Sequence, residues 1–215
     1  MGKLIKPDSL IFDMDGTLWD NVDTYAKAWT NGMYKVGFTR TITRDEILGL
    51  MGKEAAAMLN VLVPDWTEEQ KNTLFDAVSE SYQELVPTMK PVIYEGVQEG
   101  LEALSKKYKL FLLSNCEKDG LVNFMKHTGT NHLIEDYMEH GMNLKPKNYN
   151  LKLLIEKNGL QSPVYIGDTN GDSHESSLAN VPFVFVTYGF GETENYSIKF
   201  DSFKELVHYY KNKTN

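Results

Sequence analysis

The sequence predicts an α/β fold in which a doubly wound parallel sheet is interrupted by an inserted all-helical subdomain. Short apolar runs alternate with helix-like patterns, as in parallel sheets that helices cover on both faces. A long stretch after the first apolar run contains helical patterns and no persuasive strand. The length of 215 residues suits one core domain with an insertion better than two full domains.

The first expected strand is the apolar run SLIFD at residues 9–13, whose composition is typical of a strand buried on both faces. The helical insertion is expected to follow at residues 19–88. Two capping boxes mark helix starts within it, because Thr43 and Thr67 each precede a Glu or Gln by three residues. We therefore expect a separate helical domain between the first strand and the rest of the sheet.

Three further strands are expected after the insertion, at residues 110–114 (LFLLS), 164–168 (VYIGD) and 182–187 (PFVFVT). Apolar residues recur at helical spacing before the first two of these strands, so strands and helices alternate. The core domain is accordingly expected to comprise residues 1–18 and 89–215. Sheets of this kind bind ligands beyond the carboxyl ends of their strands.

The charge balance argues against nucleic acids and membranes as partners. The 22 Lys and Arg residues and 30 Asp and Glu residues give a formal net charge of −8, which repels phosphate backbones and anionic lipid surfaces. A small anionic substrate remains compatible, since a few lysines and a divalent cation make one cleft locally positive. The single cysteine, Cys116, precludes an intramolecular disulfide, and MGKLIKPDSL lacks the apolar segment of a signal peptide, so we expect a cytoplasmic protein.

Polar residues stand where the expected strands end. Asp13 ends the first strand, Ser114 and Asn115 stand at the end of the second, and Asp168 ends the third. In a parallel sheet these ends meet at one edge, so the side chains should point into one crevice. Placing the carboxylates of Asp13 and Asp15 in one buried site costs free energy unless a cation compensates their charge.

A basic residue is also expected at this edge. Lys145 directly precedes Pro146, and a proline at the first helical position would leave Lys145 in the preceding loop. Hard oxygen ligands suit Mg²⁺, while the lysine and the backbone amides of Gly16 and Thr17 suit a phosphoryl group. The sequence thus predicts a site for Mg²⁺ and a phosphorylated substrate.

The chain resembles the haloacid dehalogenase superfamily of phosphohydrolases, in particular the branch of phosphoglycolate phosphatases and β-phosphoglucomutases that carries a helical cap. The resemblance covers essentially the whole chain and is carried by four ordered motifs: Asp-x-Asp-Gly-Thr at 13–17, Ser114, Lys145 and Gly-Asp-x-x-x-Asp at 167–172. It implies a Rossmann-like core, a cap formed by the insertion and the use of Mg²⁺.

The resemblance also implies roles for individual residues. Asp13 would be a metal ligand and the nucleophile that forms an aspartyl-phosphate, and Asp15 would be the general acid and base that also offers its backbone carbonyl to the metal. Asp168 would bind the metal directly, whereas Asp172 would act through water or orient Lys145. The residues expected to bind the phosphoryl group are Gly16, Thr17, Ser114, Asn115 and Lys145.

These roles predict a Mg²⁺-dependent phosphohydrolase that acts on a small phosphorylated metabolite, a monoester, as a monomer or homodimer. Asp15 favours phosphate esters over halides, because a halide leaving group needs no proton. A phosphosugar mutase of the β-phosphoglucomutase kind remains the main alternative, since it shares the core motifs. A signalling domain phosphorylated on aspartate is a further alternative, which needs neither Asp15 nor the insertion. Lys53 either contacts the substrate from the cap or is an ordinary solvated lysine.

Overall fold

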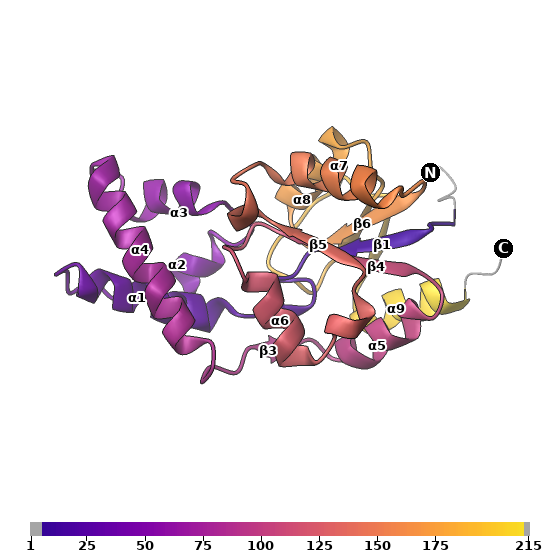
Figure 1. Ribbon diagram of the computed structural model, residues 1–215, viewed down its shortest axis with the longest axis horizontal. Helices are drawn as coiled ribbons and strands as arrows, with labels where there is room; N and C mark the ends of the chain where they lie inside the picture. Colours follow the sequence, from indigo (N-terminus) through magenta and orange to yellow (C-terminus); the bar gives the residue numbers. More distant parts are fainter. Residues whose placement is uncertain (1–5, 213–215) are drawn as a thin grey trace. The chain divides into compact units, whose positions relative to one another are not determined.

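The protein divides into two compact units. The computed structural model describes residues 6–212, so residues 1–5 and 213–215 at the ends of the expected core domain lie outside the described residues. The core unit comprises the residues up to Trp19 and those from Ile93 onward, and the helical unit comprises Asp20–Val92 (Figure 1). The divisions fall after Trp19 and after Val92, compared with expected limits after residues 18 and 88.

A six-stranded parallel sheet forms the centre of the core unit. Its strands are β1 (Ser9–Phe12), β4 (Lys109–Ser114), β5 (Asp136–Glu139), β6 (Pro163–Gly167), β7 (Phe183–Val186) and β8 (Ile198–Phe200). They are hydrogen-bonded in the order β5-β4-β1-β6-β7-β8, and each of these pairings is parallel. Parallel neighbours need crossover connections, so the doubly wound fold that the sequence predicts is confirmed.

Helices cover both faces of this sheet. Helices α5 (Val97–Ser105), α6 (Gly120–Thr128) and α9 (Phe203–Asn212) lie on one face, and α7 (Lys147–Asn158) and α8 (Asn170–Leu178) lie on the other (Figure 1). Leu10 and Phe12 of β1 pack into the first layer, whereas Ile11 packs into the second. Successive side chains alternate between the faces, which is why the strand needs apolar residues at consecutive positions.

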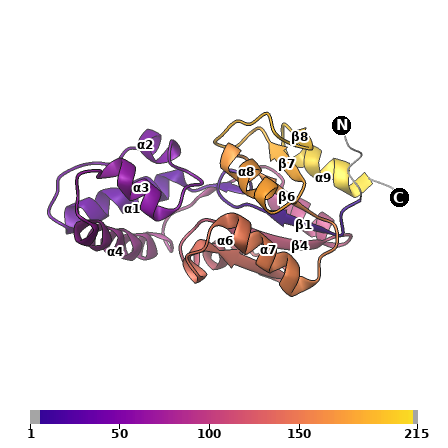
Figure 2. The same ribbon diagram turned by 90° about the horizontal axis from the view of Figure 1, so that it is seen from above.

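The helical unit contains helices α1 (Val22–Lys35), α2 (Arg44–Leu48), α3 (Ala55–Leu62) and α4 (Glu68–Leu85). Both expected capping boxes are present, with Thr43 at the start of α2 and Thr67 at the start of α4. Helix α1 packs closely against α4 (Figure 2), because Gly32 has no side chain: a Cβ there would lie 2.5 Å from Cγ2 of Val78. The helical insertion expected from the sequence is confirmed.

Several short elements were not anticipated. Strands β2 (Trp19–Asp20) and β3 (Val92–Ile93) form a two-stranded sheet where the chain passes from one unit to the other, and two short 3₁₀ helices, η1 (Asn131–Leu133) and η2 (His140–Met142), flank β5. The outer strands β5 and β8 were also missed, because their sequences DYME and IKF lack the continuous apolar run of the central strands. Within residues 6–212, no helix combines the length and the apolar composition that a bilayer crossing requires.

The register of the central strands brings their polar ends together. Phe12 of β1 pairs with Leu112 of β4 and with Ile166 of β6. Asp13 directly follows Phe12. Ser114 lies two positions after Leu112, and Asp168 lies two positions after Ile166. The edge of the sheet beyond these strands is therefore where the site forms.

Candidate active site

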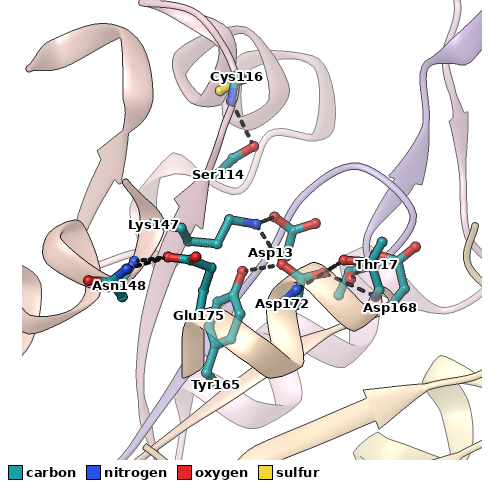
Figure 3. Close-up of polar contacts among 11 residues, drawn as sticks. Asp13, Thr17, Ser114, Cys116, Lys147, Asn148, Tyr165, Asp168, Asp172 and Glu175 are labelled. Carbon is teal, nitrogen blue, oxygen red and sulfur yellow. Dashed lines mark hydrogen bonds and ion pairs between the residues drawn. The ribbon is translucent and has the colours of Figure 1, made fainter. Parts of the chain in front are cut away.

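Asp13, Ser114 and Asp168 lie at the carboxyl edge of the sheet (Figure 3). The backbone N–H of Asp13 donates to the carbonyl of Ile166 at 2.8 Å, which continues the strand pairing one residue past β1. The three polar residues are buried, with exposed fractions of 5%, 4% and 0%. Buried carboxylates need compensating partners, and the structure supplies one of them as a lysine.

Lys147 bridges two carboxylates of the site. Its Nζ lies 2.8 Å from Oδ1 of Asp13 and 2.6 Å from Oδ1 of Asp172 (Figure 3). Lys147 is the first residue of α7, and helical side chains tilt toward the N-terminus of their helix, so the ammonium extends past the helix start to the strand ends. Burial lowers the pKa of Lys147, but the two carboxylates raise it well above its usual value, so the side chain stays charged.

The expected lysine, Lys145, does not occupy this position. Pro146 has an extended conformation with ψ of 157° and is the N-cap of α7, so the helix begins one residue later than expected. Lys145 is exposed, and its carbonyl accepts a hydrogen bond from Nδ2 of Asn150 at 3.2 Å. The assignment to Lys145 is therefore corrected to Lys147, because the start of α7 determines which lysine reaches the carboxylates.

Asp172 accepts hydrogen bonds on both carboxylate oxygens. Oδ1 accepts from Lys147 and from the hydroxyl of Tyr165 at 3.0 Å, and Oδ2 accepts from the N–H and the hydroxyl of Thr169 at 3.1 and 2.6 Å. Burial raises the pKa of Asp172, but Lys147 and these hydrogen bonds bring it below its usual value. Asp172 therefore stays ionised and holds Lys147 in place.

The other two carboxyls experience an excess of negative charge. Burial raises the pKa of Asp13 to about 7, although Lys147 opposes this rise, and Asp172 adds to it. Burial, together with Asp172 and Asp13, raises the pKa of Asp168 well above its usual value. One ammonium does not neutralise three buried carboxylates, so the site favours a further cation or bound protons.

The carboxylates form a group that suits a divalent metal. One oxygen each from Asp13, Asp168 and Asp172 lies within 4.8 Å of the others, and all three residues are buried. Oxygen ligands of this kind fit Mg²⁺ or another hard cation. Each oxygen of Asp172 already accepts two hydrogen bonds, whereas each oxygen of Asp168 accepts one, so Asp13 and Asp168 are the better-placed ligands.

The turn after β1 closes on itself and supports Asp168. The N–H of Gly16 donates to the carbonyl of Trp19 at 2.8 Å, and the N–H of Thr17 donates to the carbonyl of Met14 at 3.2 Å. The turn therefore uses both amides, which corrects the expectation that they bind a phosphoryl group. Gly16 leaves room for Asp168, since a Cβ at its φ of 87° would lie 2.1 Å from Oδ2 of that carboxylate. The hydroxyl of Thr17 donates to Oδ1 of Asp168 at 3.2 Å.

Ser114 and Asn115 stand at the end of β4. The N–H of Cys116 donates to the hydroxyl oxygen of Ser114 at 3.2 Å, which fixes the serine at the strand end. Asn115 follows directly and is half-buried. Burial raises the pKa of the Cys116 thiol well above its usual value, as do nearby carboxylates, so the thiol stays protonated.

Asp15 and Lys53, the remaining residues expected in the site, belong to different units. Asp15 accepts a hydrogen bond from the indole N–H of Trp19 at 2.9 Å, within the turn after β1. Lys53 is exposed and belongs to the helical unit, between α2 and α3. Its contact with a substrate stays a prediction.

Sequence reasoning missed three contributors to this site: Lys147, Tyr165 and the loop after β7. In that loop the N–H of Phe190 donates to Oδ2 of Asp168 at 2.7 Å, and a Cβ at Gly189 would lie 2.3 Å from Cβ of Asp168. Reading the proline before Lys147 as an N-cap would have indicated that lysine. A hydroxyl inside an otherwise apolar strand was the available signal for Tyr165, because buried hydroxyls need partners.

Comparisons with known proteins agree with this arrangement. The profile of the family described as haloacid dehalogenase-like hydrolase matches residues 10–186. The chain is 26% identical over 214 residues to a phosphoglycolate phosphatase of Rhodobacter capsulatus, an alignment that covers 92% of this chain and 94% of that protein. It is 24% identical over 172 residues to pyrophosphatase PpaX of Listeria innocua, which covers 78% of this chain and 77% of that protein.

A solved structure shares the fold. A haloacid dehalogenase-like hydrolase from Bacteroides fragilis matches with a TM-score of 0.83 at 19% identity, covering 94% of this chain and 100% of that one. The family profile spans most of the sequence and includes the strand ends that carry Asp13, Ser114 and Asp168. The chain therefore belongs to the haloacid dehalogenase-like hydrolase family.

Proposed function

We propose that this hydrolase is a Mg²⁺-dependent phosphatase that removes phosphate from a small organic monoester through an aspartyl-phosphate on Asp13. The observation that carries the proposal is the buried contact of Lys147 with Asp13 and Asp172, beside Asp168. Phosphoryl transfer needs a nucleophile and positive charge around the phosphoryl oxygens, and these residues supply both. Similarity to a phosphoglycolate phosphatase and to a pyrophosphatase supports chemistry at phosphorus.

Two carboxyls would carry the reaction. An oxygen of Asp13 attacks phosphorus while the bond from phosphorus to the ester oxygen breaks, and Asp15 gives its proton to that departing oxygen. The ionised Asp15 then takes a proton from water, whose oxygen attacks phosphorus and breaks the bond to Asp13. Inorganic phosphate leaves, and both carboxyls return to their starting states.

Lys147, Ser114 and Asn115 are the groups proposed to hold the phosphoryl oxygens. Lys147 stays charged, and its contact with Oδ1 of Asp13 places it beside the atom that would be phosphorylated. Ser114 accepts the N–H of Cys116, so its own O–H remains to be donated. Asn115 would add an amide donor at the same strand end.

The metal would be held by Asp13 and Asp168, together with the backbone carbonyl of Asp15. When bound, Mg²⁺ supplies the positive charge that keeps the Asp13 carboxylate ionised and lets it approach an anionic ester. Asp172 would act through Lys147 or through metal-bound water. The helical unit is proposed to serve as the cap that selects among small phosphorylated metabolites.

Phosphate release from a panel of compounds tests the proposal. The panel contains phosphoglycolate, pyrophosphate, several sugar phosphates and p-nitrophenyl phosphate, each with Mg²⁺ or with EDTA. We expect Mg²⁺-dependent release from a few related substrates and a loss of at least about a thousandfold in Asp13→Asn. Asp76→Asn, which changes an exposed carboxylate on α4, is the matched control and should keep the wild-type rate.

Two results would contradict the proposal. Wild-type turnover by Asp13→Asn would reject an aspartyl-phosphate at that residue. Isomerised sugar phosphate without net phosphate release would indicate a mutase, since both enzymes form the same phosphoenzyme and differ in the final acceptor.

A further inference from the structure

The indole of Trp19 contacts the carboxylate of Asp15. Nε1 of Trp19 donates a hydrogen bond to Oδ1 of Asp15 at 2.9 Å. The backbones of the same two residues form an isolated parallel bridge, and the carbonyl of Trp19 accepts the N–H of Gly16 at 2.8 Å. The turn after β1 therefore places Trp19 beside Asp15 through the backbone and through the side chain.

The core holds the Trp19 ring in one place. The residue is 2% exposed, its ring packs edge-on against Phe124 of α6 with centroids 5.1 Å apart, and the ring of His127 lies at 6.1 Å. Asp15 is less enclosed, since it is only half-buried. An indole N–H is a donor only, so a rigid tryptophan beside a more exposed carboxylate restricts the orientation of that carboxylate.

We propose that Trp19 is a positioning residue for Asp15. The inference rests on the proposed phosphatase function, in which Asp15 is the general acid. By binding Oδ1, the indole keeps the Asp15 carboxyl in one orientation. The proton can then pass to the ester oxygen without a prior change in the rotamer of Asp15. An aliphatic or phenyl side chain at this position offers no such donor.

The test is the dependence of kcat/KM on the leaving group, because kcat/KM reports the transfer to Asp13 and not the later hydrolysis of the aspartyl-phosphate, which is the same for every ester. Proton delivery matters for esters of weakly acidic alcohols and hardly at all for p-nitrophenyl phosphate, whose leaving group departs as an anion. We expect Trp19→Phe to lower kcat/KM about tenfold on phenyl phosphate and on an alkyl phosphate, and by less than about twofold on p-nitrophenyl phosphate.

Three comparisons separate positioning from loss of packing. Trp29→Phe makes the same substitution at a buried tryptophan of the helical unit and should show no selectivity for the leaving group. Benzothienylalanine at position 19 keeps the indole shape without the N–H, so it should reproduce the selective loss even if Trp19→Phe unfolds. Asp15→Asn sets the benchmark, because it removes the general acid itself.

The outcomes distinguish the inference from the function on which it rests. A selective loss in both position-19 variants supports the positioning role. The role of Trp19 is overturned if the two position-19 variants lose activity equally on every ester, or on none, while Asp15→Asn shows a selective loss. The proposed phosphatase function then remains intact. If Asp15→Asn itself shows no selectivity, or if wild-type enzyme releases phosphate from no ester, the proposed function fails and the inference fails with it.

Discussion

Lys147 is the residue on which the charge balance of the site depends. Its side chain is 3% exposed, and its ammonium contacts two carboxylates that are themselves buried. Removing one partner of a buried ion pair leaves an uncompensated charge, which costs more than the pair contributes when it is intact. The site therefore tolerates a change at Lys147 far less than a change at the exposed Lys145.

A pair of methionine variants tests this difference. We expect Lys147→Met to lower kcat at least about a hundredfold and the free energy of unfolding by about 3 kcal/mol, since Asp13 and Asp172 lose their shared partner. Lys145→Met should stay within about twofold of wild type in kcat and about 0.5 kcal/mol in stability. Phosphate release and urea unfolding measure the two quantities. Comparable losses in both variants would show that Lys147 has no special place in the site.

At the scale of elements, the start of α7 depends on a residue from α8. Pro146 is the N-cap of α7 and supplies no side-chain hydrogen bond. Glu175 of α8 caps the N-terminus of α7 instead, because its Oε2 accepts hydrogen bonds from the N–H of Asn148 at 2.7 Å and from Nδ2 of the same residue at 2.6 Å (Figure 3). A carboxylate at a helix N-terminus is also favoured by the helix dipole. Since Lys147 directly precedes Asn148, the contact with Glu175 also stabilises the position of the lysine.

Glu175→Ala tests the role of this contact. We expect a loss of about 1 kcal/mol in the free energy of unfolding, the usual cost of losing a helix cap, and a few-fold decrease in kcat because Lys147 becomes less well ordered. Glu156→Ala is the matched control: it removes an exposed glutamate near the C-terminus of α7, where a negative charge is unfavourable. Urea unfolding of both variants measures the difference. A loss no larger than that of the control would exclude the capping role.

Some elements could be predicted from the sequence and others could not. The central strands and the capping boxes at Thr43 and Thr67 each depend on residues that are close together in the chain. Local sequence patterns therefore predict them. Strands β5 and β8 lie at the edges of the sheet and carry polar residues, so their pairing with β4 and β7 stabilises them more than their own composition does.

At the scale of the whole molecule, the carboxyl edge links stability to pH and to metal. The carboxyl of Asp13 titrates near 3.8 in an unfolded chain and at about 7 in the fold. Between these values the folded protein holds more protons than the unfolded chain, so this group makes the free energy of unfolding decrease as the pH rises through that window. A metal on Asp13 must replace that proton, so its affinity should increase with pH over the same window.

Thermal unfolding with Mg²⁺ and with EDTA measures this linkage independently of activity. We expect the Mg²⁺-induced increase in Tm to grow from about pH 5 to about pH 7, because Asp13 must lose its proton to bind the metal and Asp168, whose pKa is also raised, must do the same. Asp13→Asn should show a smaller increase in Tm and a weaker dependence on pH, since only Asp168 then exchanges a proton for the metal. An increment that is the same at all pH values in the wild-type protein would mean that the metal does not compete with a proton on Asp13.

By itself, the sequence determined the parallel sheet, the helical insertion and the acidic residues at the strand ends, because each of these follows from patterns within a few neighbouring residues. Only the tertiary structure decided which lysine reaches the site and that the amides of the turn after β1 donate to carbonyls within the turn. Lys147 meets Asp13 and Asp172 across sequence separations of 134 and 25 residues. Whether Pro146 caps α7 or begins it is a choice between two local conformations, and these distant carboxylates, which stabilise the buried ammonium, favour the first.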